Sequence, residues 1–375
     1  MGFSFVVLFV SFLLLHSFQK LNSIDPGFAT DRLVLLGIET DSRELREGSR
    51  ARSAMLQLRD HAQLAGIESA SLSGWSLFEG SSRTASIRIP GRDRDPVEPN
   101  YLPVSPRFLE TMRIRLIDGR EFEARDCEAD GSSAVIVNEA FARRFFPGES
   151  ALGKRFFLLG RGNSRMPEDI VGIAANAKYT DLRTSPPVVY DPLRGVHGAT
   201  LQVRTSLDPQ MITAVLRREI RRVHPSFRIT SVTLQSTLVE NTLIRERLLA
   251  LLSGFFALVA AILSAVGLYG VLSDSVVQRT KEIGIRVALG ARQVAIVRMV
   301  ATGIALFSLI GLASGLAGGL ALSRYVATLL YEVKSTDFWN LAFPIAFLLL
   351  ACIVAALPPA LRAARVDPMV ALRYE

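Results

Sequence analysis

Residues 248–273 read LLALLSGFFALVAAILSAVGLYGVLS, 26 consecutive positions without Asp, Glu, Lys or Arg. Charged residues make up 21% of the 375-residue chain, so about one position in five should carry a charge. A helix that crosses roughly 30 Å of hydrocarbon needs about 20 apolar residues, and a buried helix of a soluble protein is usually shorter. This stretch therefore predicts a membrane-spanning helix and argues against a wholly soluble protein.

Three further runs lack charges and have membrane length, at 1–19, 299–323 and 338–361. Between the first two spans, residues 20–247 contain no such run and are numerous enough to bury a core of their own. The chain is therefore predicted to be a membrane protein with four transmembrane α-helices and a large α+β domain inserted between helices 1 and 2.

Strand and helix patterns alternate within this inserted segment. Asp208 and Pro209 suit the N-cap and the first turn of a helix. Predicted strands cover 32–39, 86–89, 134–137, 170–173 and 200–203, and predicted helices cover 47–65, 106–112, 138–146 and 209–224.

Basic residues gather in two of the three connections that follow the inserted segment. Loop 274–298 has five Lys or Arg against two acidic residues, and the segment after 361 has three against two, whereas 324–337 is balanced. The positive-inside rule assigns the two basic segments to the cytoplasm and residues 20–247 to the exterior. Orientation thus accounts for the net charge of +8, and no nucleic-acid partner is expected.

The first apolar run begins at residue 1 without a basic flank, and no small-residue cleavage site follows it. A transmembrane anchor is therefore favoured over a cleaved signal peptide. Because the run starts inside what should be a longer helix, we expect a truncated chain or part of a larger protein.

No catalytic constellation is recognisable. Residues 148–155, GESALGKR, fit the spacing of a phosphate-binding loop until Arg155, where a Ser or Thr hydroxyl should bind magnesium. The segment also follows a predicted helix rather than a strand, which argues against a nucleotide site. The two cysteines and four histidines lack metal-ligand spacing. No catalytic residue and no metal ligand are predicted, and the chain is not expected to be an enzyme by itself.

The basic loop contains QRTKEIGIRVALGA at 278–291. In a helix, Arg279, Glu282 and Arg286 share one stripe beside an apolar stripe. So short a helix is not stable alone in water, so it needs a surface to lie against. Lipid headgroups and the groove of a cytoplasmic partner both remain open as that surface.

Together with RAARVDPMVALRYE at 362–375 and a glycine-rich third span, this loop resembles the permease module of the FtsX/MacB class of bacterial ABC transporters. Residues 104–112, 118–122 and 135–148 resemble that class's periplasmic core domain. The resemblance covers essentially the whole chain. It implies a four-helix permease in the bacterial inner membrane, with 20–235 in the periplasm.

The resemblance also implies how the chain works. ATP binding closes a cytoplasmic ATPase pair, the coupling helices move, and the stiff second helix passes the movement to the periplasmic domain through a helical stalk at 236–247. Carried over by position, the ATPase-coupling element comprises Gln278, Arg279, Lys281, Glu282, Ile283, Gly284, Arg286, Leu289 and Gly290.

The expected partners follow from the same class. They are a cytoplasmic ABC ATPase supplied in trans, a second permease unit forming a homo- or heterodimer, and membrane lipid, with a periplasmic adaptor as a further candidate. The chain itself is expected to bind no cofactor, because ATP and Mg²⁺ would be held by the ATPase. Some members duplicate the unit, and this chain resembles one such half or a fragment.

Small residues recur within two spans. They let helix backbones approach closely where lipid supplies no hydrophobic drive, which predicts packing faces within or between permease units. The competing explanation is that Gly and Ala are common in membrane helices. The residues are Gly311, Gly315 and Gly319 in the third span and Ala257, Ala261 and Ala265 in the second.

Three functions remain. The favoured one is an ABC permease of the mechanotransmitting type that exports or extracts a peptide, an amphiphilic drug or a lipoprotein. The second is a non-transporting mechanotransmitter that controls a periplasmic partner such as a cell-wall hydrolase, and the third is a membrane receptor. Predicted boundaries are spans at 1–19, 248–273, 299–323 and 338–361, periplasmic segments at 20–235 and 324–337, a stalk at 236–247, and cytoplasmic segments at 274–298 and 362–375.

Overall fold

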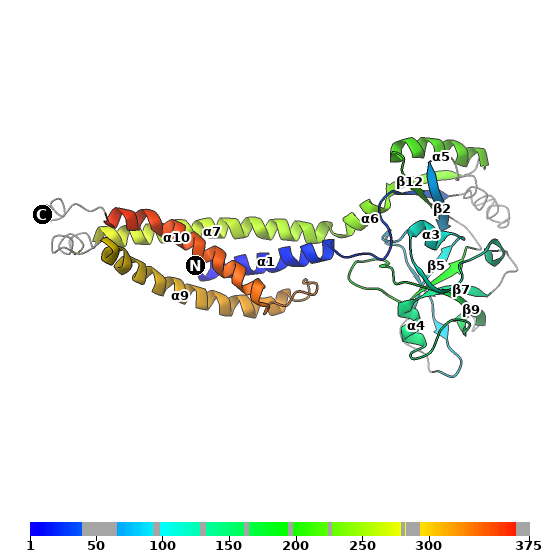
Figure 1. Cartoon of the computed structure of the whole chain (residues 1–375), viewed down its shortest axis with the longest axis horizontal. Coiled ribbons are helices and arrows are strands. Elements are labelled where there is room, and N and C mark those ends of the chain that lie inside the picture. Colours follow the sequence, from blue (N-terminus) through cyan, green and yellow to red (C-terminus); the bar gives the residue numbers. More distant parts are fainter. Residues whose placement is uncertain are drawn as a thin grey trace. The chain divides into compact units, whose positions relative to one another are not determined.

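The computed structural model describes residues 1–39, 66–92, 98–127, 133–160, 165–193, 198–223, 227–278, 282 and 293–364. These residues form two compact units (Figure 1). One unit combines Met1–Ser23 with Leu243–Glu375, and the other is Ile24–Thr242. The predicted helix at 47–65 and the tail from 365 onward lie outside the described residues.

A 12-stranded sheet runs through the described part of Ile24–Thr242, in the order β12-β1-β11-β2-β5-β10-β7-β9-β8-β4, with β3 on β5 and β6 on β9. The strands are β1 (Leu33–Glu39), β2 (Ile67–Ser73), β3 (Arg83–Thr84), β4 (Ile87–Arg88), β5 (Asn100–Val104), β6 (Leu116–Gly119), β7 (Ala134–Asn138), β8 (Arg155–Leu159), β9 (Arg165–Ala174), β10 (Val188–Pro192), β11 (Gly198–Thr205) and β12 (Arg228–Leu234).

The sheet has two halves, each with its own core. Strands β12, β1, β11 and β2 pair antiparallel, and helix α5 (Pro209–Val223) packs on them. Its Ile212, Leu216 and Ile220 are buried among the strand side chains, as the 3.6-residue period requires. The other half mixes parallel and antiparallel pairs and carries helix α4 (Glu139–Phe145), whose Phe141 is fully buried. Short helix α3 (Phe108–Met112) lies near β2 and β11.

Every predicted strand in this unit is present. Two helices begin later than predicted, for local reasons. Asn138 ends β7 and caps α4, because its Oδ1 accepts from the Phe141 amide at 2.9 Å. Arg107 has φ 67° and cannot be helical, so α3 starts at Phe108. Asp208 is the predicted cap of α5, and its Oδ1 accepts from the Met211 amide at 3.3 Å.

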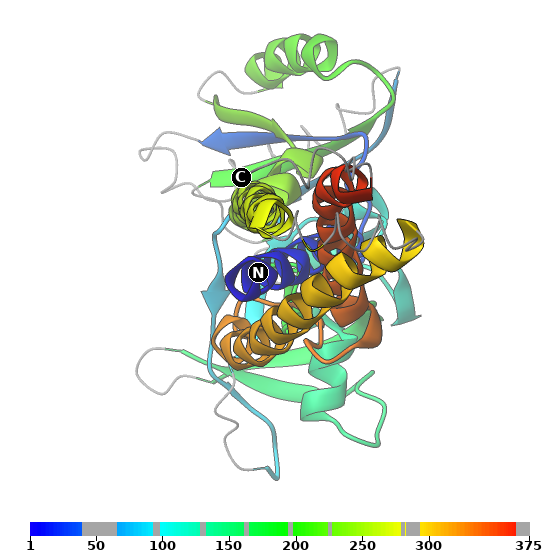
Figure 2. The ribbon, with the colours of Figure 1, turned by 90° about the vertical axis from the view of Figure 1, so that its left-hand side faces the viewer.

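The other unit is a helical bundle centred on α1 (Figure 2). Helix α1 contacts all three long helices, and its Phe5, Phe9 and Leu13 are completely buried. At one end of the bundle the Arg362 guanidinium donates to the Tyr269 hydroxyl at 3.0 Å. The helices are α1 (Gly2–Asn22), α7 (Ile244–Gln278), α9 (Gln293–Val326) and α10 (Phe338–Ala364).

Among the described residues, four helices are long and apolar enough to cross a membrane. Their outward side chains are large and apolar, as on α7, where Leu251, Phe255 and Ile262 are more than half exposed. Such a surface suits hydrocarbon rather than water. The helices run past the charge-free sequence runs, because helical hydrogen bonding continues into the flanking polar residues. Helix α6 (Gln235–Thr242) and the start of α7 make the predicted stalk helical on both sides of Leu243.

Candidate functional site

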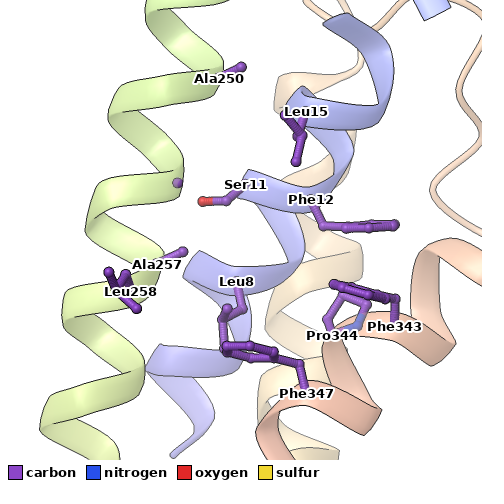
Figure 3. A pocket seen from close by; sticks show the side chains of 11 residues that line it. Leu8, Ser11, Phe12, Leu15, Ala250, Ala257, Leu258, Phe343, Pro344 and Phe347 are labelled. Carbon is purple, nitrogen blue, oxygen red and sulfur yellow. The ribbon is translucent and has the colours of Figure 1, made fainter. Parts of the chain in front are cut away.

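An apolar groove of about 240 Å³ lies in the bundle between α1, α7 and α10 (Figure 3). Helix α1 contributes Leu8 and Phe12, α7 contributes Ala257, and α10 contributes Phe343 and Phe347. Figure 3 shows these side chains converging from the three helices. The groove is therefore a product of the bundle's packing and not of any one helix.

Two contacts hold the walls of the groove. The Ser11 hydroxyl donates to the Ser253 carbonyl at 2.7 Å and fastens α1 to α7. The Phe12 and Phe343 rings stack at 4.7 Å between centroids and fasten α1 to α10. Three of the four α7 residues that line the groove are Ala or Gly, and a Cβ at Gly254 would have no atom within 4 Å.

The chemistry of the groove is limited to apolar contact. No ionisable side chain lines it, and Ser11, its one hydroxyl, is engaged with the Ser253 carbonyl. A charged or strongly polar group would lose its hydration there without compensation. The groove can hold a hydrocarbon segment or an apolar side chain, and it offers no acid, base or nucleophile.

A polar cluster joins the last turns of α1 to the segment before α10 and to the first turn of α10. The His16 Nδ1 lies 2.8 Å from the Asn340 Oδ1, the Ser17 hydroxyl accepts from the Tyr331 amide at 2.9 Å, and the Lys20 ammonium donates to the Glu332 carbonyl at 2.7 Å. The sequence patterns do not predict this cluster, since its partners are more than 300 residues apart. The signal was three polar residues at the end of an apolar run.

The predicted glycines of the third span lie against α1. A Cβ at Gly311 would come within 2.9 Å of the Met1 Cβ, and one at Gly319 within 2.9 Å of the Phe9 ring. At Gly315 it would lie 2.8 Å from the Gly2 carbonyl oxygen. In this chain, therefore, the glycine face is where α9 approaches α1.

The predicted alanines on α7 are placed less uniformly. Ala257 and Ala261 are buried, and Ala257 also lines the groove, whereas Ala265 is half-buried. The row of alanines therefore turns around the helix axis, away from the bundle interior at Ala265.

Most of the predicted coupling element lies outside the described residues, namely Arg279, Lys281, Ile283, Gly284, Arg286, Leu289 and Gly290. Gln278 ends α7, and its amide donates to the Asp274 carboxylate at 2.8 Å. Glu282 is helical and exposed. The coupling role stays a prediction.

The segment that imitates a phosphate loop connects α4 to β8. Lys154 pairs with Glu149 at 2.9 Å, and Arg155 pairs with Asp169 at 2.6 Å. The Arg155 guanidinium holds the pKa of the Asp169 carboxyl below its usual value. Lys154 and Arg155 therefore both form ion pairs within the domain. Among the described residues no cluster of three or more His, Cys, Asp or Glu could hold a metal ion.

Comparison with known proteins agrees with this architecture. Residues 254–368, which include most of α7 and all of α9, match the family model "FtsX-like permease C-terminal". The macrolide export ATP-binding/permease protein MacB of Agrobacterium fabrum is 29% identical over 284 residues, covering 71% of this chain and 42% of MacB. This chain is similar to the FtsX/MacB class of ABC permeases. The resemblance stated from the sequence is confirmed.

The FtsX/MacB-like chain spans about four tenths of the length of the curated relatives it matches. A second relative, the pyoverdine export ATP-binding/permease protein PvdT of Pseudomonas entomophila, is 26% identical over 277 residues, covering 69% of this chain and 40% of PvdT. Among solved structures, the periplasmic region of MacB from Actinobacillus actinomycetemcomitans aligns with 59% of this chain and 96% of its own at 13% identity. The TM-score is 0.38, which does not by itself establish a common fold.

Proposed function

We propose that this chain is the transmembrane subunit of a MacB/FtsX-type ABC transporter. It would couple ATP hydrolysis by a cytoplasmic ATPase subunit to movement of Ile24–Thr242 on the periplasmic side, for export or extraction of a substrate. The match of residues 254–368 to the FtsX-like permease family carries this proposal, because it spans the helices on both sides of the basic loop. Both relatives are named as export proteins.

Two covalent connections join the helical unit to Ile24–Thr242, and each is anchored within that domain by a buried polar side chain. Arg204 donates to the carbonyls of Ala29 and Asp31, just after the first connection. Gln235, fully buried before the second, donates to the Leu77 carbonyl at 2.9 Å. A displacement of either connection would therefore be passed to the sheet, which mechanical coupling requires.

The bundle would lie in the inner membrane with the basic loop and the C-terminal segment in the cytoplasm. A second permease unit, identical or related, would complete the site for an ATPase dimer, and a periplasmic adaptor remains a further candidate. The apolar groove would admit only hydrocarbon parts of lipid or substrate. The same geometry suits a mechanotransmitter that moves a periplasmic partner without transport, and a transport assay separates the two.

The test is Glu282→Lys, which reverses one exposed charge in the predicted coupling element. We expect at least fivefold less co-purified ATPase and a matching loss of ATP turnover, because a like-charge contact would replace an ion pair at the rim of the interface. Glu149→Lys is the matched control, an exposed reversal in the exterior domain that should leave both values unchanged. If Glu282→Lys also leaves them unchanged, the coupling assignment is wrong.

A further inference from the structure

Helix α5 has an outward face that is exposed in the described part of the structure. Its inward residues Ile212, Leu216 and Ile220 are at most 1% exposed. The arginines of the sequence RREIRR at 217–222 are all exposed. Four arginines of one 15-residue helix therefore point to solvent; they are Arg217, Arg218, Arg221 and Arg222.

These arginines are poorly neutralised. Glu219 of the same helix has its carboxylate 4.0 Å from the Arg222 guanidinium. Within the described part of the chain, Arg217, Arg218 and Arg221 have no carboxylate within 4.0 Å. Other arginines of the same unit have close partners, as in the pairs Arg107–Glu110, Arg120–Asp126, Arg143–Glu139 and Arg155–Asp169.

Exposed apolar side chains continue the same face. Met211 is 62% exposed and Val215 is 41% exposed. With Arg218 and Arg222 they follow the spacing i, i+4, i+7, i+11, which places all four on one stripe of the helix. The stripe is thus apolar toward the N-terminus and cationic toward the C-terminus.

We propose that this α5 face, comprising Met211, Val215 and the four arginines, docks an acidic surface of another protein on the same side of the membrane. A guanidinium matches a carboxylate with two parallel hydrogen bonds, and Arg and Met are both enriched in protein interfaces. A bilayer surface fits less well, because the apolar face that a membrane-bound helix would insert is already buried against the sheet. The proposal goes beyond the transporter assignment and depends on it only for the compartment of the partner.

The test places the photocrosslinker p-benzoylphenylalanine at Val215 of the full chain, in the membranes of the cells that produce it. Irradiation should give an adduct with a protein segment in which Asp and Glu outnumber Lys and Arg, identified by mass spectrometry. The double variant Arg217→Glu/Arg221→Glu should lower the adduct yield at least tenfold. Reversal of two acidic residues in the mapped segment to Arg should restore the yield in that background.

Arg83→Glu/Arg88→Glu is the matched control, because it makes the same change of charge at two exposed positions of β3 and β4 and should leave the adduct unchanged. The proposal is overturned if Val215 crosslinks only to lipid, crosslinks only within the chain, or gives no adduct. It is also overturned if both double variants lower the adduct yield equally. Labelling of Ser82→Cys by an impermeant reagent from outside the cell tests the compartment separately. A cytoplasmic result there would reject the transporter assignment while leaving the adduct result valid.

Discussion

Arg204 is among the largest fully buried side chains of the described residues, at 2% exposure. Its guanidinium donates to the main-chain carbonyls of Thr111, Asp31 and Ala29 at 2.8, 2.9 and 3.2 Å. Buried charge is costly unless its hydrogen bonds are satisfied, and here they are satisfied by backbone from two separate segments. One side chain therefore fixes the chain that leaves the first span against α3 and β11.

Replacement of this side chain should weaken the sheet-rich unit Ile24–Thr242. In Arg204→Met three carbonyls lose their donors, and we expect a loss of about 2–4 kcal/mol in unfolding free energy. The unfolding free energy of Arg204→Lys should lie between those of Arg204→Met and the wild type, because one ammonium cannot reach all three acceptors. Thermal unfolding followed by Trp75 fluorescence, in a Trp339→Phe background, reports on this domain alone. Equal unfolding temperatures for Arg204→Met and the wild type would contradict a stabilising role for Arg204.

Glu121 gives a prediction about pH. Burial raises the pKa of its carboxyl, although the carboxylate accepts from the Leu109 amide at 2.9 Å. The folded state therefore holds its proton to higher pH than the unfolded state, so this group's contribution to stability falls as pH rises above the unfolded pKa. Glu121→Gln keeps the acceptor and removes the charge.

We expect Glu121→Gln to unfold at a higher temperature than the wild type at pH 7 and at the same temperature near pH 4. The Trp75 signal again provides the measurement. A variant that is less stable at pH 7 would mean that the charge at Glu121 is favourable and the stated cause of its pKa shift is wrong.

The structural roles of some single residues can be predicted from the sequence, and those of others cannot. Asp208 before Pro209 was predicted as a cap, because its hydrogen bond is to a near neighbour in the chain. Arg204 was not predicted to matter, since its acceptors lie more than 90 residues away. A hydrogen bond between near neighbours in the chain can be predicted from the sequence. A hydrogen bond to a residue that only the fold brings close cannot.

At the level of elements, the contact of α9 with α1 depends on glycine. A Cβ at Gly315 would meet both the Gly2 carbonyl oxygen at 2.8 Å and the Phe5 Cβ at 2.9 Å. Gly315→Ala should therefore force the helices apart and destabilise the bundle by about 1–3 kcal/mol. The measurement is the thermal midpoint for loss of the monodisperse full chain in detergent.

Gly267→Ala is the control for this prediction. It adds the same methyl group to α7, where no atom lies within 4 Å, and it should be neutral or slightly stabilising. If both alanines have the same effect, close approach of α9 to α1 is not what requires glycine. This result would favour the alternative that glycine is simply common in membrane helices.

Element types were more predictable than element partners. The period-2 and 3.6-residue patterns predicted strands such as β7 and helices such as α5. They contained no information about the groove, which needs Phe12 of α1, Ala257 of α7 and Phe343 of α10 in one place. The order of strands in the sheet was likewise beyond pattern, because β1 pairs with β11 and β12 near the other end of the domain.

At the scale of the whole molecule, the account joins an FtsX-like helical unit to a sheet-rich unit through two anchored connections. Its central claim is that the segment around 278–291 lies in the cytoplasm, within reach of an ATPase, while Ile24–Thr242 lies outside. Charge distribution motivates this orientation. The motif was readable because it is contiguous in the sequence.

The most direct test is sided cysteine labelling of the full chain in cells, in a Cys127→Ser/Cys352→Ala background that removes both native cysteines. Thr280→Cys probes the basic loop, and Ser82→Cys probes an exposed position of the sheet-rich unit Ile24–Thr242. With a membrane-impermeant maleimide, we predict that Ser82→Cys is labelled in intact cells and that Thr280→Cys is labelled only after the membrane is opened. Labelling of Thr280→Cys in intact cells would contradict the account.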